Sequence, residues 1–316
     1  MEPGTIGGLL NKQAKLGEKC FPVVDAARLT YGEADAKSAR IASAMLAAGI
    51  GRGSRVAILF GNGPQYALAW FAAVRIGAIA MPMSTMSTAH ELRGLLLNSD
   101  AEYLVAARDY RGRDLRQLAG KAIGAAPSGA LNLPQLPVLR QIWFGISELE
   151  HAGTENDPLV AAAEAQVSSA DIMAIVHTSG STSAPKGVIH THGQVICNMQ
   201  RQNISRRLTG DDALFSNSPF FWIGGLAYSF LASFIAGAKL VCSAADPRGM
   251  LDLLEAERPT MCNGVASTVL ALASEPTFAQ RDLSSMRRGN LYPIMPADTR
   301  PADPELRYNL LGMTEA

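Results

Sequence analysis

Short apolar runs alternate with longer amphipathic stretches from Ser54 onwards, and Gly and Pro separate the two kinds of segment. Brief apolar runs between turn residues are typical of buried strands, whereas apolar positions spread over ten or more residues indicate helices. This pattern predicts strands over 55–60, 78–82 and 101–106, and helices over 65–76 and 90–97. Strands that alternate with helices favour a parallel sheet, so we expect a layered α/β fold.

A second alternating half is predicted after Asp171. It comprises strands over 172–176, 239–243 and 260–265, with helices over 248–257 and 267–274. Between the two halves, residues 112–153 contain several Pro and Gly residues among few periodic apolar positions. We expect this segment to be a surface excursion that tolerates change.

Residues 213–238 carry no charged side chain, over about the length that a membrane-spanning helix needs. Polar and helix-breaking residues interrupt the stretch, namely Asn217, Ser218, Pro219, Gly224 and Gly225. The pattern therefore favours a short strand over 213–216 and a buried helix over 226–235, and we expect no transmembrane segment.

Composition narrows the class of protein. The chain has 316 residues, 48% of them hydrophobic and 18% charged, which excludes an intrinsically disordered chain. Its 28 basic residues balance its 28 acidic ones, so no excess charge is available to bind a nucleic-acid backbone.

The cysteines and the N-terminus bear on the compartment. Cys20, Cys197, Cys242 and Cys262 lie far apart without a Cys-x-x-Cys pair, which disfavours a zinc ribbon or a secreted disulfide framework. Glu2 stands where a secretory signal needs positive charge. We therefore expect a cytoplasmic protein without a targeting segment.

The segment that most strongly indicates a ligand-binding function follows the strand predicted over 172–176. It reads His-Thr-Ser-Gly-Ser-Thr-Ser-Ala-Pro-Lys-Gly from His177 to Gly187, with five hydroxyls, two glycines and one lysine. Glycine lets the backbone approach a ligand closely, and amides, hydroxyls and an ammonium group together suit phosphate oxygens. A Walker loop is excluded because Pro185 precedes Lys186 and Gly187 follows it.

Alternative interpretations apply to the run itself, to the two histidines that follow it, and to a pair of arginines near the C-terminus. A Ser/Gly linker is disfavoured because a second apolar run over 188–192 follows directly. His190 and His192 are two positions apart, so on a strand they would lie on one face and could both bind a metal ion. Ordinary hydrogen bonding by these histidines is the simpler expectation. Arg287 and Arg288 are expected to be a solvated pair rather than a phosphate clamp.

Three segments together resemble the adenylate-forming superfamily of acyl-CoA synthetases, peptide-synthetase adenylation domains and luciferases. Residues 178–187 match its Thr-Ser-Gly-Ser/Thr-Thr-Gly-x-Pro-Lys-Gly signature, except that Ser183 replaces glycine. Residues 218–225 are similar to its Pro-x-Phe-His-x-x-Gly stretch, with Trp222 in place of histidine. Residues 311–315 are similar to Tyr-Gly-x-Thr-Glu, with Leu311 in place of the aromatic residue.

The resemblance implies a role for each matching residue. The residues implied to bind the phosphates of ATP are Thr178, Ser179, Gly180, Ser181, Thr182, Ser183, Lys186 and Gly187. The wall of a carboxylate-substrate pocket is assigned to Phe221, Trp222, Gly224 and Gly225. The alternative is that Phe220, Phe221 and Trp222 are ordinary core residues, because aromatic side chains are commonly buried. Thr314 and Glu315 would be catalytic, with Thr314 at the α-phosphate and Glu315 holding Mg²⁺.

The family likeness also implies a fold and an activity. The fold is the layered α/β/α N-terminal domain of the family over 1–316, with subdomains 54–190 and 20–53 plus 191–316, truncated before the barrel and the small C-terminal lid domain. The activity is ATP-dependent conversion of a fatty or cyclic apolar carboxylic acid to acyl-AMP and then, with coenzyme A, to acyl-CoA.

Two hypotheses of different kinds follow for the chain itself. Without the family's lid lysine, it is expected to bind ATP but to be catalytically incomplete. The alternative is a non-catalytic remnant or interaction module that keeps the fold. An open sheet edge would make a homodimer plausible.

Overall fold

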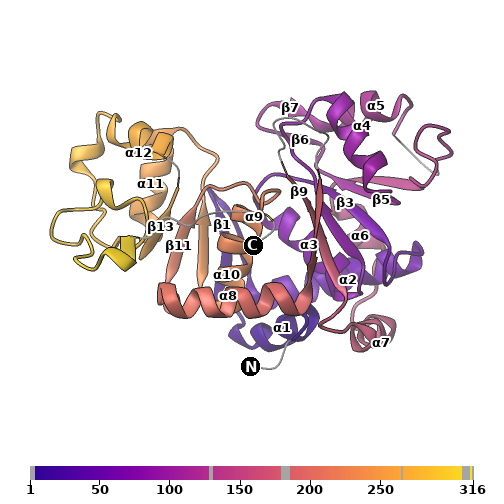
Figure 1. Ribbon diagram of the computed structural model, residues 1–316, viewed down its shortest axis with the longest axis horizontal. Coiled ribbons are helices and arrows are strands. Elements are labelled where there is room, and N and C mark those ends of the chain that lie inside the picture. Colours follow the sequence, from indigo (N-terminus) through magenta and orange to yellow (C-terminus); the bar gives the residue numbers. More distant parts are fainter. Residues whose placement is uncertain (1–3, 128–130, 179–185, 265, 308–313, 315–316) are drawn as a thin grey trace. The chain divides into compact units, whose positions relative to one another are not determined.

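Two compact units make up the chain (Figure 1). The computed structural model describes residues 4–127, 131–178, 186–264, 266–307 and 314. The first unit contains residues up to Glu18 and Tyr31–Cys197, and the second contains Lys19–Thr30 and Asn198–Thr314. Residues 31–53, which the sequence analysis grouped with the second subdomain, belong to the first unit because α2 (Tyr31–Ala47) packs against α3 (Pro64–Arg75).

A six-stranded sheet forms the centre of the first unit, in the order β10-β9-β4-β3-β5-β8. The strands are β3 (Arg55–Leu59), β4 (Ile79–Pro82), β5 (Tyr103–Ala106), β8 (Gln141–Phe144), β9 (Ile172–His177) and β10 (Gly187–Thr191). Neighbouring strands are parallel except that β10 is antiparallel to β9. The predicted parallel sheet and its strands over 55–60, 78–82, 101–106 and 172–176 are therefore confirmed to within two residues.

Helices cover both faces of this sheet. Successive strand residues point to opposite faces, so Ala57 and Leu59 lie on one side and Val56 and Ile58 on the other. Ala57 and Leu59 pack with leucines of α4 (Ala89–Asn98) and α5 (Leu115–Ile123). α3 contacts β3 and β4 and is itself packed by α2, and further helices of the unit are α1 (Ile6–Gln13), α6 (Ser147–Ala152) and α7 (Pro158–Gln166).

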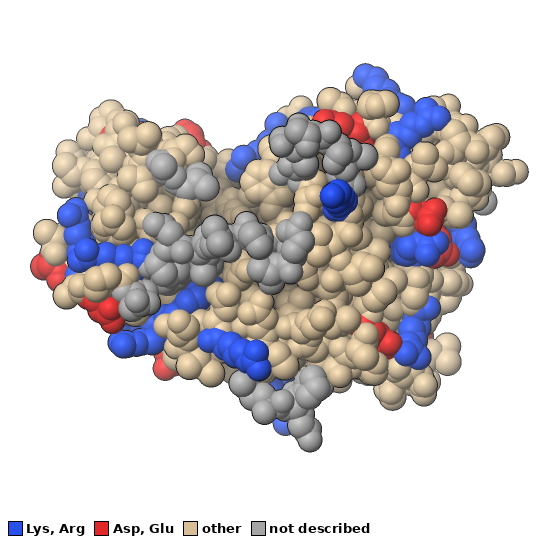
Figure 2. All heavy atoms as spheres, in the orientation of Figure 1, with Lys and Arg blue, Asp and Glu red and all other residues tan. Residues whose placement is uncertain are grey.

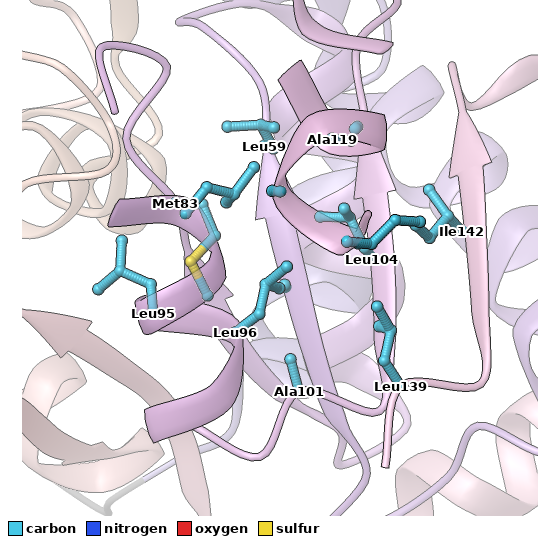
Figure 3. Packing of buried hydrophobic residues seen from close by; sticks show 14 of the residues in the cluster. Leu59, Met83, Leu95, Leu96, Ala101, Leu104, Ala119, Leu139 and Ile142 are labelled. Atoms are coloured by element: carbon cyan, nitrogen blue, oxygen red, sulfur yellow. The ribbon is translucent and has the colours of Figure 1, made fainter. Parts of the chain in front are cut away.

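Residues 112–153 are not a surface excursion, and this expectation is wrong. Ala119 of α5, Leu139 and Ile142 are buried in the same core as Leu59 of β3 and Leu96 of α4 (Figure 3). Leu115 and Leu118 of α5 belong to the same core. The turn residues here separate short elements: Asp114 caps the start of α5, Gly124 ends it in a left-handed conformation, and β8 then extends the sheet. Two further strands, β6 (Asp109–Tyr110) and β7 (Arg113–Asp114), form a separate hairpin.

A five-stranded sheet forms the centre of the second unit, in the order β13-β11-β12-β1-β2. Its strands are β1 (Cys20–Val24), β2 (Ala27–Thr30), β11 (Ala213–Ser216), β12 (Lys239–Cys242) and β13 (Met261–Asn263). Leucines of α11 (Pro247–Glu257) and Leu272 of α12 (Ala266–Ala273) pack on one face. Phe21 of β1 packs instead against Phe230 and Phe234, at ring-centroid distances of 5.3 and 5.4 Å.

The uncharged stretch 213–238 folds as the sequence predicts, into β11 followed by consecutive helical turns. These turns are α9 (Ile223–Gly225), the π-helical turn η2 (Leu226–Leu231) and α10 (Ala232–Ala236). No helix among the described residues is long and apolar enough to cross a membrane. The remaining helical elements are α8 (His192–Arg206), η1 (Ala14–Leu16), η3 (Phe278–Gln280), η4 (Tyr292–Ile294) and η5 (Pro304–Arg307).

Charge is distributed as the balanced composition implies. On the face in Figure 2, Lys and Arg side chains occur at several separate places, some of them beside Asp and Glu. Inside the first unit, however, the guanidinium of Arg75 is only 4% exposed. It pairs with Asp35 at 2.9 Å and with Glu164, and it donates to the hydroxyl of Ser38 at 2.8 Å. Arg75 thereby ties α3 to α2 and α7.

We expect Arg75→Met to lower the free energy of unfolding by about 3 kcal/mol, because it leaves the partly buried carboxylates of Asp35 and Glu164 without their cation. Arg108→Met is the matched control, since Arg108 and Glu148 are both more than half exposed and lie 3.6 Å apart. The control should change stability by no more than about 0.5 kcal/mol. Urea unfolding measures both, and equal effects of the two changes would contradict the assignment.

Candidate functional site

The hydroxyl-rich run begins and ends on a β-hairpin. Thr178 directly follows β9, and Gly187 opens β10, where it pairs with His177. The backbone N–H of Thr178 donates to the carbonyl of Lys186 at 2.9 Å. The structure thus brings Thr178, Lys186 and Gly187 together at the base of the connection. Ser179, Gly180, Ser181, Thr182 and Ser183 lie outside the described residues.

Parallel pairing determines where this hairpin opens. Because β9 runs parallel to β4, and β4 to β3, all three strands end at the same edge of the sheet. The crevice beyond the carboxyl ends of parallel strands is where open α/β sheets bind ligands. The neighbouring loop after β4 is fixed by Arg113, whose guanidinium donates to the carbonyl of Thr85 at 2.6 Å and to that of Ser87.

Lys186 carries the positive charge of the run. Its side chain is exposed, and no carboxylate among the described residues pairs with it. Burial lowers the pKa of His177, the only other titratable residue between positions 177 and 187, so this imidazole adds no charge at neutral pH. An ammonium group with no carboxylate partner among the described residues, in a run rich in glycines and hydroxyls, is suited to an anionic ligand such as a phosphate chain.

The aromatic segment of the second unit divides into core and surface. Phe220 is fully buried and packs on Phe230, at 5.1 Å between ring centroids. Phe221 is 5% exposed, whereas Trp222 is 43% exposed and stands edge to face against Phe221 at 5.5 Å. The plain-core alternative therefore describes Phe220 and Phe221, and Trp222 is the aromatic side chain available to a ligand.

Two adjacent glycines follow Trp222, and of the two only Gly225 is required for lack of space. A Cβ on Gly225 would overlap the carbonyl of Pro219, because the two backbone segments touch there. A Cβ on Gly224 would meet only the hydroxyl of Ser218, at 3.2 Å. Gly225 has ordinary helical dihedrals, so its constraint is one of space.

The third matching segment is largely outside the described residues. Thr314 is a half-buried turn residue of the second unit. Leu311, Gly312 and Glu315 are not described, so the roles implied for Thr314 and Glu315 stay predictions.

Ordinary hydrogen bonding is found only at one nitrogen of the two histidines after the run, because the buried Nε2 atoms of His190 and His192 have no hydrogen-bond partner among the described residues. Nδ1 of His192 accepts a hydrogen bond from the backbone N–H of Ile6 at 3.2 Å. This N–H opens α1 and would otherwise have no partner within the helix. Burial lowers the pKa of His192 to about 4 and lowers that of His190 as well. Both imidazoles are therefore neutral at physiological pH.

The expectation for the two arginines is correct for Arg287 and wrong for Arg288. The side chain of Arg287 is 60% exposed, whereas that of Arg288 is 10% exposed and pairs with the buried carboxylate of Asp212. Asp212 also accepts from the hydroxyl of Thr260 at 2.7 Å. The apolar residues around Arg288, including the buried Met286 and Leu291, were the sequence signal of its burial.

Comparisons with known proteins find one family and many relatives. Residues 11–316 match the family described as AMP-binding enzyme. A putative acyl-CoA synthetase, YngI, of Bacillus subtilis is 31% identical over 307 residues, which are 90% of this chain and 55% of that protein. Feruloyl-CoA synthase of an Amycolatopsis species is 30% identical over 260 residues, 82% of this chain and 48% of that one.

Solved structures show the same fold. The N-terminal domain of FACL13 from Mycobacterium tuberculosis has a TM-score of 0.76 at 24% identity, covering 92% of this chain and 72% of that chain. The anthranilate CoA ligase AuaEII, in complex with anthranoyl-AMP, has a TM-score of 0.76 at 19% identity, covering 91% and 54%. The predicted layered α/β/α fold is thereby confirmed. The chain spans about half the length of the curated relatives it matches.

We expect Gly225→Ala to destabilise the second unit by about 1–3 kcal/mol, because backbone atoms of Pro219 and Ser218 must move to admit a methyl group. Gly224→Ala is the matched control, and it should change stability by less than about 0.5 kcal/mol, since a side-chain hydroxyl can rotate away. Urea unfolding followed by tryptophan fluorescence distinguishes the two. Equal stabilities would show that the close approach is absent.

We expect acidification from pH 6.5 to 4.5 to cost the parent protein roughly 2–3 kcal/mol more than it costs His192→Gln. The unfolded imidazole binds a proton near pH 6.5 and the folded one near pH 4. The unfolded state therefore binds more protons between these values, and stability present above pH 6.5 is lost as the pH falls. Unfolding free energies at several pH values measure this. Parallel curves for the two proteins would contradict it.

Proposed function

Because this chain belongs to the family of AMP-binding enzymes, we propose that it binds ATP and takes part in activating a carboxylic acid for transfer to coenzyme A. The proposal is supported by the match over residues 11–316 and by relatives named as acyl-CoA and aryl-CoA ligases. The observation that carries it is the hairpin that puts Lys186 at the carboxyl edge of a parallel sheet, with no carboxylate partner in the part of the chain that the structure describes.

The proposed chemistry has two steps. A carboxylate oxygen of the acid attacks the α-phosphorus of ATP, which forms acyl-AMP and releases pyrophosphate. The thiolate of coenzyme A then attacks the acyl carbon, which forms the thioester and releases AMP. Neither step uses a covalent bond to the protein, so binding and charge neutralisation supply the catalysis.

We assign the phosphate chain of ATP to the hairpin. Lys186 would neutralise one of the outer phosphates, and backbone amides with the hydroxyls of residues 178–183 would donate to the others. A side chain at position 187 would crowd this base of the hairpin, since a Cβ on Gly187 would lie 2.7 Å from Cγ2 of Ile175. In this assignment the two residues that hold the connection closed, Thr178 and Lys186, also hold the ligand.

Thr314 and Glu315 would act at the reacting phosphate. A hydroxyl at position 314 suits donation to an α-phosphate oxygen. The carboxylate of Glu315 offers the oxygen donor that Mg²⁺ prefers, and bound Mg²⁺ would neutralise charge that develops between the phosphates.

The acid would bind beside the aromatic segment of the second unit. Trp222 offers an exposed apolar ring, and Phe221, Gly224 and Gly225 shape the same loop. An apolar ring favours an acid with a fatty or cyclic body over an amino acid. Several relatives are named for aromatic acids, among them feruloyl-CoA synthase and 3-hydroxybenzoate–CoA ligase.

We expect Lys186→Ala to weaken binding of MgATP about 10- to 100-fold, because one charge-assisted contact to phosphate is lost. Lys121→Ala is the matched control. Lys121 is an exposed lysine of α5 in the same unit, it hydrogen-bonds Gln117, and its removal should leave affinity unchanged. Titration calorimetry measures all three proteins.

Two outcomes of this titration would contradict the proposal in different ways. If the parent chain releases no heat with millimolar MgATP, the ATP-binding function is wrong, and a non-catalytic module with the same fold is favoured instead. If the parent binds MgATP and Lys186→Ala binds it equally well, the phosphates are held elsewhere.

A further inference from the structure

A buried hydroxyl pair lies directly beneath the loop that presents Trp222. Ser216 ends β11 and Ser229 lies in η2, and each is 2% exposed. The hydroxyl of Ser229 donates to Oγ of Ser216 at 2.7 Å, and it also lies 3.3 Å from the carbonyl of Gly224. One side chain of η2 thus contacts both the strand before the loop and the helical turn after it.

The π-helical turn explains why Ser229 can reach both partners. A π-turn contains one more residue per turn than an α-helix, and such turns occur mostly as single bulges, often at functional sites. Here the wide turn spans Leu226–Leu231 and sits between two α-helical segments. It directs the side chain of Ser229 toward β11, while the side chain of Phe230 enters the aromatic core beside Phe21.

The loop itself is held by short backbone contacts at both ends. The N–H of Ser218 donates to Oγ of Ser216 at 3.4 Å, and that of Trp222 donates to the carbonyl of Pro219 at 3.0 Å. The carbonyl of Trp222 accepts from the N–H of Leu226 at 2.8 Å. The backbone on both sides of Trp222 is therefore held by hydrogen bonds within the loop, and the loop is attached to β11 through Ser216.

The geometry points to Ser229 as a positioning residue that holds Trp222 in place and thereby sets the affinity for the apolar body of the acid. This inference rests on the proposed function, because the acid is its ligand. Ser229 is buried and does not contact the acid itself. It acts because its hydroxyl joins Ser216 to the carbonyl of Gly224, two residues after Trp222.

The physical reason is the cost of leaving buried polar groups without partners. Without the hydroxyl of Ser229, Oγ of Ser216 loses its closest described partner, and the carbonyl of Gly224 loses a polar contact at 3.3 Å. Buried polar groups in this situation move until they find another partner. Movement at Gly224 shifts the turn that follows Trp222 and so changes the direction of the indole.

Fluorine NMR of protein labelled with 5-fluorotryptophan tests this directly. The chain has three tryptophans, and the signal lost in Trp222→Phe identifies the reporter, while Trp70 and Trp143 in the first unit serve as internal references. We expect Ser229→Ala to shift or broaden the Trp222 signal and to leave the other two unchanged. Ser216→Ala should have the same effect, and the double variant should add little, because both changes break one contact.

Binding of trans-cinnamate, a carboxylic acid with an apolar ring, tests the functional half. Titration of the parent should move the Trp222 signal. Ser229→Ala should weaken cinnamate about 3- to 10-fold, which corresponds to one buried hydrogen bond, and should leave MgATP affinity at the parent value. Ser99→Ala is the matched control, since Ser99 is a buried serine of the first unit whose hydroxyl donates to the carbonyl of Leu95.

The outcomes separate this inference from the proposed function. An unchanged Trp222 signal in Ser229→Ala overturns the positioning role, and so does an equal loss of cinnamate and MgATP affinity, which would indicate general loosening. If cinnamate does not move the Trp222 signal of the parent, the recognition role is overturned. If the parent fails to bind MgATP, the proposed function falls, while the signals of the variants still report whether Ser229 positions Trp222.

Discussion

Parallel pairing of β9 with β4 is the constraint on which the candidate site depends. Because β3, β4 and β9 run the same way, their carboxyl ends meet at one edge, and the hydroxyl-rich run leaves β9 there. The antiparallel return of β10 then closes the run between Thr178 and Lys186. A run of hydroxyls and glycines on a free linker would have no such fixed base. Here the sheet supplies the base, and in the proposed function the run would supply the donors.

Electrostatics at this edge follow from burial as much as from composition. Desolvation keeps His177, His190 and His192 neutral at physiological pH, so the charge between positions 177 and 192 comes from Lys186 alone. Elsewhere two buried cations, Arg75 and Arg288, pair with carboxylates, and a third, Arg206, donates to the carbonyl of Tyr228 at 3.0 Å. The buried arginines thus have structural partners inside the units, whereas Lys186 is exposed. A neutral net charge is compatible with a locally positive site for this reason.

Much of the fold could be predicted from the sequence because its strands are short apolar runs between Gly, Pro and polar residues. The helix α2 was not predicted, since its many Ala and Ser residues give little contrast, although Ala34, Ile41 and Met45 recur at helical spacing. Residues 112–153 were misjudged because their prolines separate small elements instead of marking a loop. In the candidate site, the run 178–187 has a pattern that predicts phosphate binding. The contact of Ser216 with Ser229 joins positions 13 residues apart across a π-turn and leaves no pattern in the sequence.

The position of β1 in the second sheet has a consequence for synthesis of the chain. β1 pairs with β2 immediately, but its other neighbour is β12, which begins at Lys239. At ribosomal speeds of 5–20 residues per second, roughly 10–40 s separate the emergence of the two strands. Throughout that interval the hairpin exposes an unpaired edge and the ring of Phe21. A nascent chain of this design depends on chaperones for longer than its size alone would suggest.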